Sequence, residues 1–363
     1  MGNVFGRALK LTIFGESHGE SIGCVMDGLP PGFAVDWDRV REEMARRAPG
    51  NTDLATPRKE KDAFQVLSGM FEGKTTGAPL AMEIRNENKR SSDYSILKDT
   101  MRPGHADYTG RVKYGGFNDY RGGGHFSGRI TAPLNFAGAV ARQYLEQAGI
   151  GIAAHVLAIH GIRDRSFQPM GESAETLAPL RSMKIPVLEE AQGALMEEEI
   201  RTYREKGDSV GGIIECIAQG LPVGAGDPFF DSAESEIAHM MFSVPAVKGI
   251  EFGEGFGIAG MTGSSANDPM AWGENGPEIT ENHNGGILGG ITNGNPLLFR
   301  LAVKPTPSIG QRQRTVNMKE KKDTELSVGG RHDPCIVLRA VPVAENALAF
   351  VLLDTLMTGG LLA

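Results

Sequence analysis

The chain has 363 residues, of which 40% are hydrophobic and 23% are charged, as is typical of soluble globular proteins. Its formal net charge of −8 at pH 7 argues against a nucleic acid or an anionic membrane surface as the main partner. An anionic ligand must therefore be held by a local cluster of arginines.

Three cysteines, Cys24, Cys216 and Cys335, lie far apart and form no C-x-x-C pair. This spacing predicts neither a zinc site nor a disulfide framework, and it fits a reducing cytosol. Lys10 interrupts the apolar stretch that a signal peptide would need. The C-terminal stretch ALAFVLLDTLM is too short to span a bilayer and contains Asp354, which favours a buried helix. We expect a cytoplasmic protein with no membrane or nucleic acid partner.

Strands and helices are mixed along the whole chain, which predicts an α/β or α+β class. Asp36 is a suitable N-cap for the first helix. No repeat, linker or change of composition appears, so we predict a single domain, 1–363. In chain order, hydrophobic periodicity and turn residues predict strands 8–14 and 22–27, helix 36–47, strands 64–71 and 80–84, a helix from Pro133 to Gly149, strand 152–162, helix 188–206, strand 212–218, helix 229–242, strand 297–303 and helix 344–357.

A glycine-flanked serine, in the motif GESHG, lies between the first two predicted strands. It matches the G-x-S-x-G pattern of hydrolases, in which a strand, a sharp turn and a helix present Ser17 as a nucleophile. Here the following residues, ESIGCVMDGLPPG, are typical of a strand, so the structural context is wrong. Neighbours in an extended chain point to opposite faces, so we expect no dyad between Ser17 and His18. His18 is either a buried histidine or a functional one.

A second short motif, GFGIAG at 255–260, matches the dinucleotide-binding pattern G-x-G-x-x-G. That fold needs a helix to begin at the motif and an acidic residue about 20 positions later. The residues that follow, MTGSSANDP, are typical of turns. The motif therefore does not predict a dinucleotide-binding domain.

Residues 86–128 have no regular pattern, and irregular stretches of this length are commonly functional. Within MRPGHADYTG, a Pro-Gly turn presents Arg102 and His105 to the same site. Within DYRGGGHFSGRIT, three glycines between Arg121 and Arg129 allow a flat or anionic ligand to approach the backbone. Guanidinium groups bind carboxylates and phosphates through paired hydrogen bonds. The alternative is a flexible, solvated loop.

Further candidate residues lie outside that stretch. Arg46 and Arg47 end the first helix and are either ligand-binding residues or a helix C-cap. The segment HNGGILGGITNGNP is rich in glycine and nearly uncharged, which suits contact with a planar cofactor. No metal-ligand spacing is present, and the pattern predicts chemistry on a small anion that carries phosphate and carboxylates. The segments VKPTPSIGQRQR and VGGRHDPC add Lys304, Ser308, Arg331, His332 and Asp333, the last being either a turn residue or a catalytic carboxylate.

Eight segments in this order resemble the chorismate synthase family over nearly the whole chain. They are GESHGESIGCVMDGLPPG, RRAPG, RPGHADYT, RGGGHFSGR, SVPAVKGIEFGEGFG, NHNGGILGGITNG, KPTPS and GRHDPCIVLRAVPVAE. The resemblance implies an α+β fold, a β-α-β sandwich, and a homotetramer. It also implies 1,4-elimination of phosphate from 5-enolpyruvylshikimate-3-phosphate to give chorismate, the last common step of aromatic amino acid biosynthesis. Reduced FMN is required without net redox change and would lend electron density to the allylic system.

The resemblance also implies residue roles. The catalytic residues would be His18, His105 and Asp333. One histidine would be the acid for the leaving phosphate and the other would act on the reduced flavin, while Asp333 would assist proton transfer at the flavin. The substrate-binding residues would be Ser17, Arg47, Arg102, Arg129 and Arg331. The flavin-binding residues would be Arg47, Asp53, His125, Phe126, Ser127, Pro245, Ala246, Gly289, Lys304, Pro305, Thr306, Pro307, Ser308 and Arg331.

The chain departs from the family pattern at two places. Many members have arginine where this chain has Asp53, and an Arg-Ser pair where it has His125-Phe126. Each change removes positive charge from the expected anion site. Arg58 or Lys59 would supply the missing charge. His125 would be a substitute for arginine whose charge depends on pH. A flavin-binding protein without turnover is therefore the alternative. Because no dinucleotide fingerprint is present, we expect an external flavin reductase, with NADPH acting only indirectly.

Overall fold

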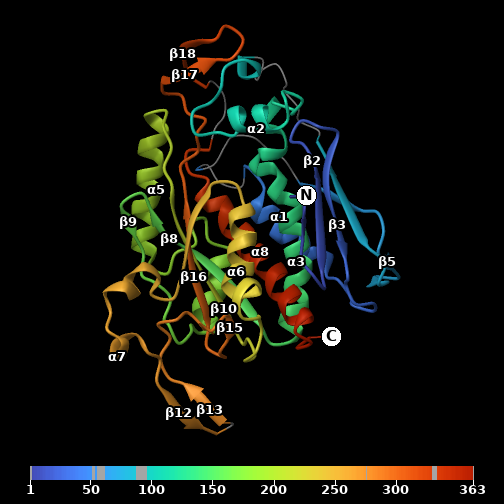
Figure 1. Ribbon diagram of the computed structural model, residues 1–363, viewed down its shortest axis with the longest axis vertical. Helices are drawn as coiled ribbons and strands as arrows, with labels where there is room; N and C mark the ends of the chain where they lie inside the picture. The colour runs from blue at the N-terminus through green and yellow to red at the C-terminus, as the bar shows by residue number, and fades with distance from the viewer. Residues whose placement is uncertain are drawn as a thin grey trace.

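Two five-stranded antiparallel sheets enclose a layer of helices in the computed structural model of the protein (Figure 1). The structure describes residues 2–50, 54, 62–86, 96–274, 276–328 and 333–362. The first sheet has the order β1-β2-β3-β7-β4, formed by Val4–Phe5, Lys10–Gly15, Ser21–Asp27, Leu80–Arg85 and Phe64–Val66. The second sheet has the order β11-β16-β10-β8-β9, formed by Val247–Phe252, Leu297–Val303, Gly212–Gln219, Gly151–Ile159 and Ile162–Arg163.

The helices between the sheets complete a β-α-β sandwich. Helix α3 packs on the first sheet, whereas α8 and α6 pack on the second. Neighbouring strands of both sheets are antiparallel, so the class is α+β, and the fold that the resemblance implied is confirmed. The inner helices are α1 (Trp37–Arg47), α3 (Thr131–Gln147), α6 (Ala233–Ser243) and α8 (Val337–Thr358), while α5 (Glu190–Glu205) lies at the outer side of the second sheet and α2 (Asp107–Lys113) lies beyond one end of the helical layer.

Short elements connect and extend these layers. They are β5 (Met70–Phe71) with β6 (Lys74–Thr75), α4 (Ala174–Leu177), α7 (Gly263–Ala266), β12 (Met270–Gly273) with β13 (Gly276–Ile279), β14 (Ile287–Leu288) with β15 (Ile291–Thr292), and β17 (Gln313–Asn317) with β18 (Lys322–Leu326). The β12–β13 and β17–β18 hairpins project from opposite ends of the molecule (Figure 1).

Local chemistry accounts for the bounds of α1. The Asp36 carboxylate accepts hydrogen bonds from the backbone N–H groups of Asp38 and Arg39, as predicted for an N-cap. The helix ends at Arg47, directly before Ala48 and Pro49, because the residue before a proline is disfavoured in helical geometry.

Helix α8 is the core helix of the fold. Its side chains are buried around the whole helix from Val337 to Leu356, which is typical of a helix packed on every side. By length and composition it is apolar enough to cross a membrane, but 89% of its most apolar window is buried within the protein. Gly138 of α3 allows close packing, because a Cβ there would lie 1.9 Å from the Asn346 carbonyl oxygen. The predicted buried helix is confirmed, although it begins seven residues earlier and passes through Pro342.

Four sequence predictions differ from the structure. The strand predicted at 152–162 is a hairpin, because the chain turns at His160, which has a φ of +52°, and β9 pairs antiparallel with β8. The strand predicted at 64–71 is divided into β4 and β5 because Gly69 turns the chain with a φ of +85°. The helix predicted at 229–242 is divided because Ser232 is extended and caps α6. The stretch 86–128 is not irregular throughout, since it contains α2 and short 3-10 turns within Arg121–Phe126 and at Gly128–Ile130, although Gly122, Gly123 and Gly124 are not helical.

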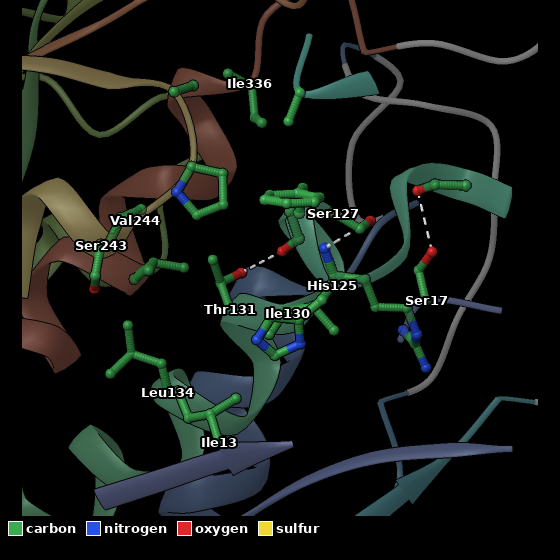
Figure 2. Close-up of a pocket in the computed structure, with 18 of the residues that line it drawn as sticks. Ile13, Ser17, His125, Ser127, Ile130, Thr131, Leu134, Ser243, Val244 and Ile336 are labelled. Carbon is green, nitrogen blue, oxygen red and sulfur yellow. Dashed lines mark hydrogen bonds between the residues drawn. The ribbon is translucent and has the colours of Figure 1, made fainter. Parts of the chain in front are cut away.

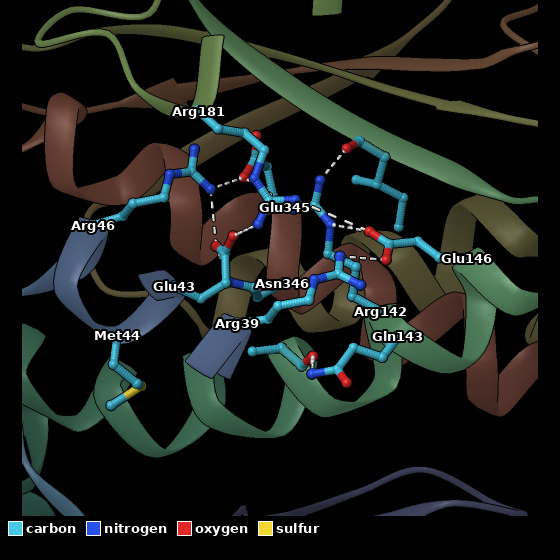
Figure 3. A network of polar contacts seen from close by, with 12 residues as sticks. Arg39, Glu43, Met44, Arg46, Arg142, Gln143, Glu146, Arg181, Glu345 and Asn346 are labelled. Carbon is cyan, nitrogen blue, oxygen red and sulfur yellow. Dashed lines mark hydrogen bonds and ion pairs between the residues drawn. The ribbon is translucent and has the colours of Figure 1, made fainter. Parts of the chain in front are cut away.

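A buried network of charges joins the inner helices (Figure 3). Glu345 of α8 accepts hydrogen bonds from Arg46 of α1 at 2.5 Å and from Arg142 of α3 at 3.3 Å. Glu43 of α1 pairs with Arg46 and with Arg181. Burial alone would raise the pKa of Glu345, but the nearby guanidinium groups lower it below its ordinary value. The network therefore holds charged side chains in the interior, and it fixes how three helices cross.

A second buried cluster ties β8 to β10. The His155 ring lies between two carboxylates, with Nδ1 3.1 Å from Asp164 and Nε2 3.0 Å from Glu215. Burial alone would lower the pKa of His155, but these hydrogen bonds raise it above its ordinary value. A histidine whose pKa is higher in the folded than in the unfolded state stabilises the fold when it is protonated. This contribution is complete below about pH 6.5, the pKa of an unfolded-state histidine, and it is lost as the pH rises through the folded-state pKa.

We therefore expect the free energy of unfolding to fall as the pH rises above about 6.5, measured by urea denaturation. The pKa values of Asp164 and Glu215 are lowered, so these carboxylates are ionised throughout this range and add no slope. His155→Gln should remove the dependence, whereas the exposed His160→Gln should keep it. An equal slope in the His155→Gln variant would contradict this assignment.

Candidate active site

A cavity of about 2010 Å³ opens between the first sheet, the helical layer and the loops before α3. Single-ligand pockets commonly enclose about 300–1,000 Å³, so this cavity has room for two ligands side by side. Sixteen of the predicted site residues line it: Ser17, His18, Arg47, Arg102, His105, His125, Phe126, Ser127, Arg129, Pro245, Ala246, Lys304, Thr306, Pro307, Ser308 and Asp333.

The Ser17–His18 turn joins β2 to β3 at one side of the cavity. Because β2 and β3 form an antiparallel hairpin, no helix follows the serine, as the sequence pattern predicted. The expectation of no contact between Ser17 and His18 is wrong: Ser17 Oγ lies 3.2 Å from His18 Nδ1, since the two residues form a turn instead of an extended strand. Two carbonyl oxygens, of Arg121 at 3.3 Å and Gly122 at 3.0 Å, can accept the Ser17 hydrogen. Such acceptors hold the hydroxyl on the loop, unlike that of a nucleophile paired with its base.

The glycine loop 122–124 separates the two predicted catalytic histidines. Its three residues have positive φ values of 59°, 87° and 55°. A Cβ at Gly122 would lie 2.2 Å from the His18 ring, and one at Gly123 would lie 3.3 Å from Nε2 of His105. The backbone of this loop therefore approaches both imidazoles closely, and glycine is needed at Gly122 because a side chain there would collide with His18.

A buried carboxylate orients His105. The Nδ1 atom of His105 lies 2.6 Å from Asp107 Oδ1 and 3.1 Å from Arg102 Nη2. The carboxylate is the nearer of the two and only accepts, so Nδ1 donates to Asp107. Arg102 donates to the same carboxylate from Nε and Nη2, both at 2.8 Å, and from Nη1 to Ser308 Oγ at 3.1 Å. Burial alone would raise the pKa of Asp107, but hydrogen bonds from Arg102 and His105 hold it well below its usual range.

A second buried carboxylate holds two predicted substrate-binding arginines together. Asp62 lies 2.8 Å from Arg47 Nη2 through Oδ2 and 2.8 Å from Arg129 Nη1 through Oδ1. Arg47 also donates to Thr131 Oγ1 at 3.2 Å, and Arg129 Nε donates to Asn86 Oδ1 at 2.7 Å. One carboxylate between two guanidinium groups leaves a net positive charge on this wall, which favours an anionic ligand.

The segment 304–308 forms another wall of the cavity. Lys304 Nζ donates to the Gly104 carbonyl and so joins this segment to the turn that carries Arg102 and His105. The Thr306 hydroxyl is buried and has no hydrogen-bond partner within the described part of the chain. An ammonium group beside an unsatisfied hydroxyl is suited to a phosphate oxygen. Pro305 lines a smaller adjoining hollow instead of the main cavity.

The remaining wall of the cavity is apolar, and Figure 2 shows it opposite Ser17, with Val244 and Leu134 on the far side. Pro245 and Ala246 continue this wall, and Ala246 has a φ of +77°, a rare conformation for a residue with a side chain. A broad apolar wall beside the segment that carries Lys304 fits a planar ring that carries a phosphate. Other members of the wall are Phe5, Leu11, Ile13, Met240, Ile336 and Val343.

His125 and Phe126 line the cavity but contact the protein. The ring nitrogens of His125 lie 2.7 Å from the Gly15 carbonyl oxygen and 3.1 Å from Asn3 Oδ1. The Phe126 ring packs on Gly110 of α2. In this arrangement His125 joins the glycine loop to the N-terminal strands, so it does not present a free nitrogen in place of the family's arginine.

Other predicted residues are placed as follows. Asp333 pairs with Arg339 of α8, with 2.6 Å between Oδ2 and Nη1, and it faces the cavity. Gly289 lies in the turn between β14 and β15 and does not line the cavity, so within one copy of the chain it is not part of this site. Asp53 and Arg331, as well as Arg58, Lys59 and His332, lie outside the described residues.

Three side chains that sequence patterns did not single out help to build the site: Asp62, Asn86 and Asp107. The sequence held one signal, since Asp107 follows His105 by two residues in RPGHADYT, close enough to orient its ring. Asp62 and Asn86 give no such signal, because their partners are distant in the sequence.

Comparisons with known proteins agree over the whole chain. The family model described as chorismate synthase matches residues 9–357. A chorismate synthase of Korarchaeum cryptofilum is 45% identical over 356 residues, covering 98% of each chain. One of Pyrococcus abyssi is 46% identical over 354 residues, covering 97% of each. A crystal structure of chorismate synthase superimposes with a TM-score of 0.76 at 28% identity, covering 98% of this chain and 93% of the other.

Proposed function

Because the chain belongs to the chorismate synthase family, a family of carbon–oxygen lyases, we propose that the cavity between its sheets is the active site of this reaction. The reaction removes phosphate from 5-enolpyruvylshikimate-3-phosphate and forms chorismate, which serves aromatic amino acid biosynthesis. The observation that carries the assignment is the pair His18 and His105, on either side of one glycine loop, in a cavity with paired arginines.

The cationic wall stabilises the leaving phosphate. As its C–O bond breaks, negative charge grows on the phosphate, and preorganised donors lower the barrier by about 3 kcal/mol each. Arg47 and Arg129 are held in place by Asp62 before the substrate arrives, so they need not reorganise. His18 lies on the same side and can donate a proton to the phosphate, worth about 10²–10⁴-fold in rate.

The apolar wall and the segment 304–308 would hold FMN, with Lys304 and Thr306 at its phosphate. When bound and reduced, the flavin supplies transient electron density to the allylic system. His105 faces this side with Nδ1 engaged by Asp107, which leaves Nε2 as the atom that exchanges a proton. Asp333 also lines the cavity, where it pairs with Arg339, and it would accept or return a proton there.

We predict that Asp107→Asn lowers kcat about 10- to 100-fold. An amide in place of the carboxylate no longer orients His105 through Nδ1. The matched control is Asp354→Asn, because Asp354 is also a buried carboxylate that accepts N–H groups, from Arg7 and Leu9, but lies outside the cavity. A loss of kcat in the Asp107 variant alone would support the assignment, and unchanged kcat would contradict it.

The reaction is tested by mixing pure protein, reduced FMN and 5-enolpyruvylshikimate-3-phosphate without oxygen. Stoichiometric phosphate release with chorismate formation is expected. Tight flavin binding without phosphate release would favour the alternative, a flavin-binding protein without turnover, to which the positions of His125 and Phe126 point. Labelling of Ser17 by a fluorophosphonate would favour a hydrolase instead.

We also propose a single-domain, cytoplasmic homotetramer that depends on an external flavin reductase. One cluster of buried apolar side chains includes residues of both sheets, which supports one domain. Phe229, Phe230, Phe256 and Trp272 are each at least 85% exposed, and such apolar surface supports association with further copies of the chain. A tetramer mass in light scattering and no steady NADPH oxidation by protein plus FMN are the expected results. A monomer mass, or sustained NADPH oxidation, would contradict these proposals.

A further inference from the structure

The side chain of Asn86 connects two parts of the cavity wall that come from distant segments. Asn86 follows the last residue of β7, and its backbone N–H continues the ladder to β3 by donating to the Glu20 carbonyl at 3.0 Å. Its side-chain amide is buried and turns toward the Ser17–His18 turn on one side and toward Arg129 on the other.

All the contacts of this amide have a defined direction. Nδ2 donates to the Glu16 carbonyl at 3.0 Å and to the Gly19 carbonyl at 3.1 Å, the two ends of the turn that contains Ser17 and His18. Oδ1 accepts from Arg129 Nε at 2.7 Å. Carbonyl oxygens only accept and a guanidinium group only donates, so the orientation of the amide is fixed by its partners.

We infer that Asn86 is a positioning residue that sets the distance between the Ser17–His18 turn and Arg129, so that both reach the same leaving phosphate. The inference rests on the proposed function. No other natural side chain reproduces this geometry, because it requires two donors and an acceptor on one short, planar group. Aspartate keeps the acceptor for Arg129 but places a carboxylate against two carbonyl oxygens, and alanine removes both functions.

The experiment compares Asn86→Ala, Asn86→Asp and Asn86→Gln with the wild type in the anaerobic phosphate-release assay. Asn86→Ala and Asn86→Asp are expected to lose about 10²-fold in kcat/KM, the effect of a displacement of about 1 Å at a reacting group. In Asn86→Asp the loss should appear in kcat, since the contact with Arg129 is kept. Asn86→Gln should recover part of the activity, because it retains the donors and the acceptor on a longer side chain.

The matched control is Gln143→Ala. Gln143 of α3 is also buried, donates to the Asp36 and Ala139 carbonyls and accepts the Asp36 N–H, but it does not line the cavity. It should lose stability without a comparable loss of kcat. An equal loss in both alanine variants, or an Asn86→Asp variant with wild-type kcat, would overturn the inference.

A readout independent of turnover is the crystal structure of Asn86→Asp, in which the Ser17–His18 turn should be displaced from Arg129. An unchanged turn would contradict the inference whatever the assay shows. Absence of phosphate release by the wild type would instead reject the proposed function, so the two failures are distinguishable.

Discussion

Replacing His18 with asparagine is expected to lower kcat about 10²–10⁴-fold, the range for loss of a general acid. Asparagine retains a polar atom near the position of Nδ1, so the contact with Ser17 Oγ, 3.2 Å in the wild type, can persist. What disappears is the far nitrogen of the ring and its proton. The loss should therefore appear in kcat, measured as anaerobic phosphate release, with a smaller effect on KM.

Two variants control for this result. His160→Asn changes a histidine on the surface that pairs with Glu199, and it should retain wild-type kcat. Ser17→Ala should lose less activity than His18→Asn, because its hydroxyl is held by carbonyl oxygens of the glycine loop. If His18→Asn kept kcat within about threefold of the wild type, His18 could not be the acid.

Gly122→Ala is expected to lower kcat about 10²-fold while the fold is retained. The new Cβ would lie 2.2 Å from Cε1 and Nδ1 of His18 and 2.7 Å from Ser17 Oγ, so both side chains must move. A displacement of about 1 Å at a catalytic group is enough for a loss of this size. Alanine at a φ of +59° also costs about 1–2 kcal/mol in backbone strain.

The variant Gly149→Ala distinguishes the effect of backbone strain from the effect of the collision with His18. Gly149 has a φ of +79°, and no atom lies within 4 Å of the point that a Cβ would occupy, so alanine there brings strain alone. Gly149→Ala should lose thermal stability from the strain without losing kcat, whereas Gly122→Ala should lose at least as much thermal stability and also lose kcat. Full activity in the Gly122→Ala variant would show that the His18 ring does not depend on the space above this glycine.

Local patterns in the sequence predicted the longer helices and most of the longer strands, but not β11, α2 or the short hairpins. The strands on either side of the GESHG turn, the Asp36 cap of α1 and the buried C-terminal helix all follow from periodicity, capping and turn chemistry. The predictions at 64–71 and 229–242 were wrong where one residue, Gly69 or Ser232, interrupts an apolar run. Periodicity averages over a window and does not detect a single such residue.

The residue types of the site could be predicted from the amino-acid pattern: arginines, two histidines and a run of glycines, in an order that resembles one family. Their contacts with one another depend on the folded chain. Ser17 contacts His18, and Asp62 joins Arg47 to Arg129. Asn86 donates hydrogen bonds to the Ser17–His18 turn, and His125 contacts the N-terminal strands. Except for the first, these contacts join residues 15 to 122 positions apart. The sequence pattern describes neighbours along the chain, whereas the chemistry of a site depends on which side chains the folded backbone brings within about 3 Å of one another.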